Sequence, residues 1–322
     1  MKPAFLALIT TLGCAMGEAQ AQDFCITSMR VAGSSQMEFQ WTCPANGFYA
    51  IQKSPDLVSG FVTIATVPAR GGTNTYTGAI GTAPRGFYRV TQIAFDTTVT
   101  QVGDALNQTL IALGTSGRDR ITQTGTGTTA YTMSATGGGG DDWIEQHGAD
   151  GDDALSANVG AGNSYVDQEG GAGNNVLGAT GVARGNHTFV QKGEAGNDGM
   201  SVDDSANDGG ASITQEGGAG DDIIEANGSQ GDDTIRIDAG SGNDPITYDQ
   251  TTGHDTVTVD GGDGDDTLTI NNGGLSSILL RDDTGHVLFQ VGAGDTVITV
   301  KNLEHLTILD EKGGTVFHWD KP

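Results

Sequence analysis

The sequence repeats a short glycine-aspartate unit about every eleven residues between residues 117 and 268. Each unit opens on a glycine, with Thr129 in the place of one glycine, and consecutive openings are 11 to 13 residues apart. The openings are Gly117, Thr129, Gly140, Gly151, Gly162, Gly173, Gly185, Gly196, Gly209, Gly220, Gly231, Gly242, Gly253 and Gly264. A unit this short holds one strand and one turn, so it must stack on other units to bury a core.

The fourth residue after each opening is apolar in all fourteen units, although the region is mostly polar. These residues are Ile121, Met133, Ile144, Leu155, Val166, Leu177, Phe189, Met200, Ile213, Ile224, Ile235, Ile246, Val257 and Leu268. An apolar residue fixed at one place in a repeat predicts a common narrow core. The economical architecture is a parallel β-solenoid.

Two residues further along, on the same face of a strand, glutamine occupies every second unit. The glutamines are Gln123, Gln146, Gln168, Gln191 and Gln215. This alternation indicates that one full coil is two units, with a strand on each side, and that the region holds seven coils. Inward glutamines would stack as a ladder; the alternative is that they lie solvated on an open face.

The turn sequences resemble a known calcium-binding repeat. The stretches "GGGGDDWIE" (137–145), "GGAGDDIIE" (217–225) and "GGDGDDTLT" (261–269) are similar to the G-G-x-G-x-D-x-U-x unit of hemolysin-type, repeats-in-toxin proteins. This resemblance implies a β-roll that binds Ca²⁺. The period of eleven in place of nine departs from that family. The glycine and glutamine spacing also resembles curlin repeats, which implies a curli-like fibre subunit as the alternative.

Alternate turns of such a solenoid lie on opposite edges, so the residues two places after each opening form two stacks. The first acid column is Tyr131, Asp153, Asn175, Asp198, Asp222, Asp244 and Asp266; the second acid column is Asp119, Asp142, Ser164, His187, Ala211, Asp233 and Asp255. Calcium prefers such oxygen ligands. We expect a ladder of ions along the first column and partial occupancy at the ends of the second.

The expected metal ligands are therefore residues of both columns. They are Asp153, Asn175, Asp198, Asp222, Asp244, Asp266, Asp142, Asp233 and Asp255. An alternative interpretation is that Gly, Asn and Asp recur only because they form turns well.

The charge of the chain favours a bound cation. The formal net charge is −26, and residues 114–273 hold 28 of the 41 acidic residues but only five Lys or Arg. Such a balance argues against a nucleic-acid partner, and a chain this acidic tends towards disorder unless the charge is offset.

The N-terminus has the pattern of an export signal. Residues 1–21 combine Lys2, an apolar run and Ala19-Gln20-Ala21, which predicts a signal peptide cleaved after Ala21 and a secreted or cell-surface protein. Acylation of Cys14 in a lipoprotein is the alternative. No later stretch has the length of a transmembrane segment.

Residues 22–95 contain short alternating runs separated by turn residues, which predicts a small antiparallel β-sandwich. The stretches "FYAIQKSPDL" and "GFYRVTQ" resemble fibronectin type III-like modules. A hairpin centred on Ser34 would place Cys25 directly opposite Cys43, close enough for a disulfide; two free thiols are the alternative.

The sequence as a whole predicts an all-β protein. Residues 96–113 are expected to form a linker and N-terminal cap, 114–273 a β-solenoid with 11-residue half-coils, and 274–322 a C-terminal β cap. No hydrolase, zinc-protease or phosphate-loop motif occurs. We expect a non-enzymatic calcium-binding protein of adhesion, surface or matrix function, with a matrix or cell-surface partner or self-association. The alternatives are a fibre subunit and the carrier region of a secreted toxin or enzyme.

Overall fold

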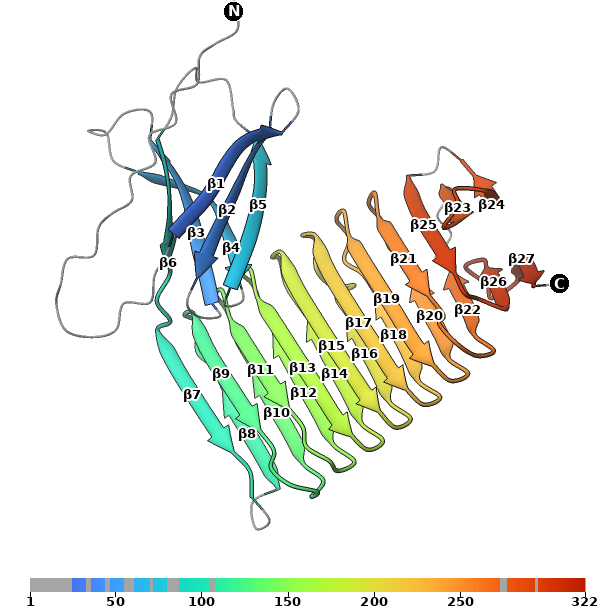
Figure 1. Cartoon of the computed structure of the whole chain (residues 1–322), viewed down its shortest axis with the longest axis horizontal. Helices are drawn as coiled ribbons and strands as arrows, with labels where there is room; N and C mark the ends of the chain where they lie inside the picture. The colour runs from blue at the N-terminus through green and yellow to red at the C-terminus, as the bar shows by residue number, and fades with distance from the viewer. Residues whose placement is uncertain are drawn as a thin grey trace, which may run out of the picture. The chain divides into compact units, whose positions relative to one another are not determined.

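All the regular elements in the described residues are β-strands, and the chain divides into two compact units, Met1–Ala94 and Phe95–Pro322 (Figure 1). The computed structural model describes residues 25–32, 36–43, 47–54, 61–69, 72–79, 87–104, 108–272, 277–292 and 295–321. The predicted signal peptide, residues 1–21, lies outside these ranges. The predicted fold class, an antiparallel sandwich followed by a parallel β-solenoid, is confirmed. No described segment forms a helix that could span a membrane.

The N-terminal unit contains two three-stranded antiparallel sheets, ordered β1-β2-β5 and β4-β3-β6. Their strands are β1 (Cys25–Ala32), β2 (Gln36–Cys43), β3 (Gly47–Ser54), β4 (Val62–Ala69), β5 (Gly72–Ala79) and β6 (Phe87–Gln92). Phe39 and Trp41 from one sheet pack with Tyr49, Ile51 and Val90 from the other in a single buried cluster. Alternation of apolar and polar residues along the strands places these side chains between the sheets.

The first hairpin has a register that differs from the sequence prediction. A β-bulge between Ile26 and Ser28 shifts the pairing by one residue, so Cys25 lies opposite Thr42. The prediction that Cys25 lies directly opposite Cys43 is therefore wrong, because the bulge inserts one extra residue into β1. The side chains of both cysteines are outside the described part of the structure.

The C-terminal unit winds into a solenoid whose two faces are long parallel sheets (Figure 1). The first sheet contains β7 (Thr97–Val102), β9 (Asp119–Thr124), β11 (Trp143–His147), β13 (Tyr165–Ala172), β15 (His187–Ala195), β17 (Ala211–Ala219), β19 (Thr234–Ser241), β21 (Thr256–Asp260) and β25 (Thr296–Lys301). The second contains β8 (Thr109–Leu113), β10 (Thr132–Thr136), β12 (Ala154–Val159), β14 (Val176–Gly181), β16 (Gly199–Asp203), β18 (Ile223–Asn227), β20 (Pro245–Asp249), β22 (Thr267–Asn271) and β26 (His305–Leu309).

The solenoid has about nine turns rather than the seven predicted. At its start, β7 and β8 lie in residues 96–113, which the sequence suggested to be a linker, and they pair in parallel with β9 and β10. At its end, β25 and β26 continue the two sheets beyond β21 and β22. Coils outside the regular series of units therefore extend the solenoid in both directions.

Two antiparallel strands close the far edge of the solenoid. In the first sheet, β23 (Ile278–Asp282) follows β25 and carries β24 (Val287–Val291) on its outer side; in the second, β27 (Thr315–Asp320) pairs with β26. Each sheet thus ends on a short strand that reverses direction. Such strands cover the row of backbone groups that a parallel coil would leave open.

The predicted core positions are all buried. Every one of the fourteen apolar residues from Ile121 to Leu268 is at most 2 % exposed. They form one continuous cluster along the solenoid, together with the alanines and aliphatics two places further along in the alternate units. The eleven-residue period therefore identifies the interior correctly.

The glutamines stack inside the core as a continuous ladder, and the alternative of a solvated face is wrong. Gln123, Gln146, Gln168, Gln191 and Gln215 are 0 % exposed. Each donates from Nε2 to Oε1 of the glutamine one coil earlier at 2.7–2.9 Å, beginning on Gln101. Each also donates at 3.0–3.2 Å to a backbone carbonyl of the opposite sheet. The amides thus bind neighbouring coils and opposite sheets together.

The ladder ends at Gln215, because Ile237 occupies the same place in the next coil. The Oε1 atom of Gln215 accordingly has no hydrogen-bond partner among the described residues. An interior member, such as Gln168, uses both amide atoms within the ladder.

Replacing Gln146 with leucine should destabilise the protein more than replacing Gln215 with leucine. The first change leaves both Oε1 of Gln123 and an N–H of Gln168 unpaired, whereas the second leaves only Oε1 of Gln191 unpaired within the ladder. One additional buried unpaired group costs about 1 to 3 kcal/mol. Urea unfolding followed by circular dichroism measures the difference; equal losses in the two variants would contradict the ladder.

Candidate functional site

Both acid columns are real stacks, and their side chains point into the turns. Asp198, Asp222, Asp244 and Asp266 of the first column are at most 1 % exposed, and Asp142 and Asp233 of the second are at most 2 % exposed. For five of the six acids, the residue five places earlier is a glycine at which an added Cβ would meet the carboxylate; for Asp244 it is the buried Ala239. The chain therefore wraps closely around these acids, and glycine makes room for the carboxylate in five of the six turns.

One carboxylate oxygen of each acid holds the coils in register. In the first acid column, Oδ1 accepts the backbone N–H of the equivalent residue one coil earlier, from Tyr131 onwards, at 2.5–3.0 Å. The series ends where the N–H of Asp266 donates to Oε2 of Glu304 at 3.1 Å. These bonds satisfy backbone donors at the edge of the sheets, where the strands have already turned away.

The second oxygen of most of these acids has no partner. Among the described residues, Oδ2 is buried and unpaired in Asp142, Asp198, Asp222, Asp233, Asp244 and Asp266. A buried charged oxygen without a partner is costly, so it requires a proton or a cation.

The unpaired oxygens occur mainly in turns that share one backbone conformation. In five of the six turns, the residues four and two places before the acid both have positive φ: Gly138 and Gly140, Glu194 and Gly196, Gly218 and Gly220, Gly240 and Gly242, Gly262 and Gly264. Asp233 is the exception. In contrast, Thr115 and Ala149, four places before Asp119 and Asp153, are not in this conformation, and there the backbone N–H donates to Oδ2 at 2.5 and 2.7 Å.

Asn175 reveals what a group in the Oδ2 position faces. Its turn has the same conformation, with φ of 92° at Gly171 and 121° at Gly173. Its Nδ2 donates to the carbonyl oxygens of both glycines at 3.2 Å. By the repeat, an aspartate in the same turn directs a carboxylate oxygen towards two carbonyl oxygens. Three oxygens that converge in this way repel each other unless something positive lies between them.

Burial changes the acidity of these carboxyl groups in the same sense. It raises the pKa of Asp142 and Asp222 to about 7 and that of Asp233 and Asp266 to about 6. It also raises the pKa of Asp198 and Asp244. The acids therefore take up a proton readily when no cation is bound.

The donor chemistry of these turns fits Ca²⁺, which binds carboxylate and carbonyl oxygens. Asp198, Asp222, Asp244 and Asp266, with Asp142 and Asp233, would supply the carboxylates, and the glycine turns the carbonyls. Nowhere in the described residues do three His, Cys, Asp or Glu side chains gather around one point. An ion here would accordingly take most of its ligands from the backbone and from water.

The structure gives the other three predicted ligands internal partners. Oδ2 of Asp153 accepts the N–H of Ala149, and the amide of Asn175 binds its own turn. In Asp255, Oδ2 accepts hydrogen bonds from Tyr248 at 3.1 Å and Thr296 at 3.4 Å. Glu304, which ends the first column, was not expected, because it lies in a segment without the repeat.

An exposed outer column of Asp and Asn runs beside the first acid column. The residue before each buried acid is exposed, and its Oδ1 accepts the N–H of the equivalent residue one coil later at 2.8–3.0 Å. This outer column comprises Asp152, Asn174, Asn197, Asp221, Asn243 and Asp265. Aspartate and asparagine both occur here, since Oδ1 is common to both; Nδ2 of Asn243 adds a long contact with Oδ1 of Asp221 at 3.4 Å, and Asp265, the last residue of the column, pairs with His305 at 2.9 Å.

No protein-family model, curated protein or solved structure matches the chain. The resemblance to hemolysin-type repeats therefore rests on the glycine-aspartate motif.

The raised pKa values predict an unusual pH dependence for the calcium-free protein. Because the folded-state pKa exceeds the ordinary value of 3.8, the native protein keeps protons that the unfolded chain has released. This stabilisation is complete below about pH 4 and is lost as the pH rises through about 6 to 7. In chelator, the thermal midpoint should thus fall between about pH 5 and about pH 8, and calcium should flatten the slope. A midpoint in chelator that rises with pH would contradict the assignment.

Proposed function

We propose that this protein is an exported, non-enzymatic β-solenoid that binds Ca²⁺ along the first acid column and depends on the ion to hold its coils together. The observation that carries this proposal is the set of buried Oδ2 atoms without a partner, in turns whose equivalent in Asn175 presents two carbonyl oxygens. A calcium ion would neutralise the carboxylates and satisfy the carbonyls at once.

The proposed role is adhesion, surface coating or construction of an extracellular matrix. The solenoid is long and regular, and the acids recur with the repeat, which favours a structural task over acid-base catalysis. The export signal expected in residues 1–21 would deliver the chain to a compartment where calcium is plentiful.

A curli-like fibre subunit is the second candidate, and the buried glutamine ladder favours it. Stacked glutamines of this kind are a feature of fibre-forming repeats, although the ladder ends at Gln215, before the last coils of the solenoid. The reversed strands β24 and β27 count against this, because they cover the far edge of both sheets. The remaining alternative, a carrier region of a toxin or enzyme, has no support from the described geometry.

The decisive comparison is between two triple variants with the same change of charge. Asp198→Asn, Asp222→Asn and Asp244→Asn together should fold without calcium, because each new amide can bind its turn carbonyls as Asn175 does. The matched control is Asp152→Asn, Asp221→Asn and Asp232→Asn, which are exposed residues immediately before a buried acid, each with an Oδ1 that accepts a backbone N–H of the next coil. Calorimetric calcium titration and the thermal midpoint in chelator measure both.

We expect the inner triple to lose more than half of the calcium-induced rise in midpoint and the control triple to keep it. A wild-type protein that folds equally well with calcium and with chelator, over neutral to alkaline pH, would overturn the calcium proposal. Calcium-independent fibres that bind thioflavin would support the second candidate in its place.

A further inference from the structure

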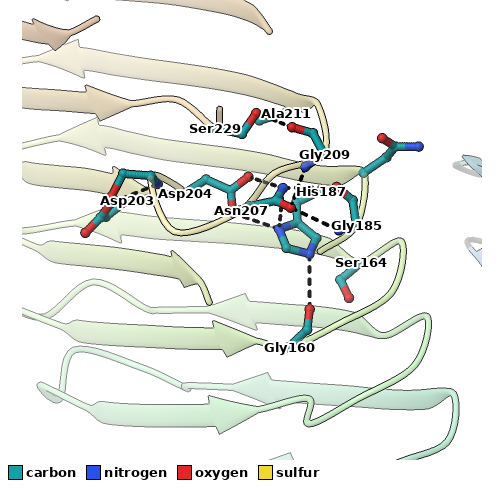
Figure 2. A network of polar contacts seen from close by, with 12 residues as sticks. Gly160, Ser164, Gly185, His187, Asp203, Asp204, Asn207, Gly209, Ala211 and Ser229 are labelled. Atoms are coloured by element: carbon teal, nitrogen blue, oxygen red, sulfur yellow. Dashed lines mark hydrogen bonds and ion pairs between the residues drawn. The ribbon is translucent and has the colours of Figure 1, made fainter. Parts of the chain in front are cut away.

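The second acid column has no carboxylate in its middle, and a buried histidine occupies the gap (Figure 2). His187 stands between Ser164 and Ala211 in the column, and its side chain is 0 % exposed. The longest unit of the repeat, from Gly196 to Gly209, brings an additional loop to this point, and Asp204 and Asn207 in that loop are also 0 % exposed. A titratable pair is thus enclosed where the repeat is interrupted.

Both ring nitrogens of His187 face oxygen acceptors. Nδ1 lies 2.7 Å from Oδ1 of Asp204, and Nε2 lies 3.2 Å from the carbonyl oxygen of Gly160 (Figure 2). The other carboxylate oxygen of Asp204 accepts a hydrogen bond from Nδ2 of Asn207 at 2.8 Å. Asn207 is itself held by Gly185, whose N–H donates to its Oδ1 at 3.0 Å.

This arrangement decides the protonation of the ring. A neutral imidazole has one N–H and one lone pair, so it would set the lone pair of one nitrogen against an oxygen. The carbonyl of Gly160 can only accept, and the carboxylate of Asp204 can only accept while it is ionised. A ring with a proton on each nitrogen satisfies both contacts, and the resulting charge is balanced by Asp204 within the same enclosure.

We propose that His187 carries a proton on both ring nitrogens and acts as a built-in cation of the second acid column, clamping three successive coils. Gly160 belongs to the coil before His187, and Asp204 leads into the coil after it. The imidazolium therefore does in the middle of the column what an ion between coils would do, without any bound metal. This assignment is independent of the proposed function.

The surrounding glycines make room for the clamp. A Cβ added at Gly181 would lie 1.8 Å from Oδ1 of Asp204 and 2.6 Å from Nδ1 of His187. A Cβ at Gly185 would lie 2.9 Å from Nε2. The edge of the ring also contacts Phe189, at 5.9 Å between ring centroids and nearly perpendicular. The histidine is accordingly fixed in position and cannot rotate towards solvent.

The direct test is nitrogen-15 NMR of the histidine rings in the wild-type protein, at neutral pH, with calcium and again with chelator wherever the chain stays folded. We expect both nitrogens of His187 to show the shift of a protonated imidazolium nitrogen in either condition. One unprotonated ring nitrogen in the calcium-loaded protein would overturn the proposal. Because calcium saturation is included, failure of the calcium proposal leaves this result interpretable.

Two variants test the clamp itself. Asp204→Asn removes the counter-charge, so the ring should lose one proton in the same spectrum. His187→Asn removes the cation and should speed amide hydrogen exchange in the coils around Gly160 and Asn207 at least 10-fold. His254→Asn is the control for loss of a histidine from a turn, because His254 stands in a turn three coils further on, one place earlier in its unit than His187, and is 70 % exposed. Unchanged exchange in the folded His187→Asn variant would contradict the clamp.

Discussion

The stacking of buried carboxylates in the turns is the constraint on which the solenoid depends. An acid such as Asp222 holds a backbone N–H of the neighbouring coil with one oxygen, and in six of the acids the other oxygen is buried in the turn without a partner among the described residues. The first contact gives the register, and the second creates a charge that the fold cannot balance by itself. The stability of the solenoid is therefore coupled to the proton or cation that occupies the turn. Because the chain carries a formal charge of −26, a bound cation contributes more stability as the pH rises and the acids lose their protons.

The core solves a related problem without charge. The central stripe of the core has two residues on each strand, so aliphatic side chains alone would leave the coils free to slide along each other. The glutamine ladder removes that freedom, because a shift of one residue would leave every glutamine amide without its hydrogen-bond partners in an apolar interior. Beyond Gln215, Ile237 and its successors replace the ladder, and there the acid columns and the capping strands remain to fix the register.

Much of the solenoid fold could be predicted from the sequence, because the eleven-residue period determines which side chains point inward. Ile121 to Leu268 and the five glutamines follow from spacing alone. The coil at β7 and β8 could not be found in this way, since no glycine stands four residues before Val99 or Leu110, and the segment that forms β23 and β24 separates β25 and β26 from the last regular unit. The distinction between Asp153 and Asp198 depends on φ four residues earlier, and Glu194 adopts the conformation of a glycine there. His187 and Asp204 come into contact only because the unit from Gly196 to Gly209 has an inserted loop, and the repeat pattern does not predict where such a loop lies.

The hydrogen bond between Asp266 and Glu304 has a consequence for the history of the molecule. In each earlier coil of the first acid column from Asp153 onwards, the side chain accepts a backbone N–H of the preceding coil, and the backbone N–H of the same residue donates to the side chain of the next coil. An interior coil can therefore be duplicated or deleted whole, and Glu304 still accepts the N–H of whichever acid comes last. The length of the rod is thus a quantity that selection can adjust in whole steps without redesigning either end.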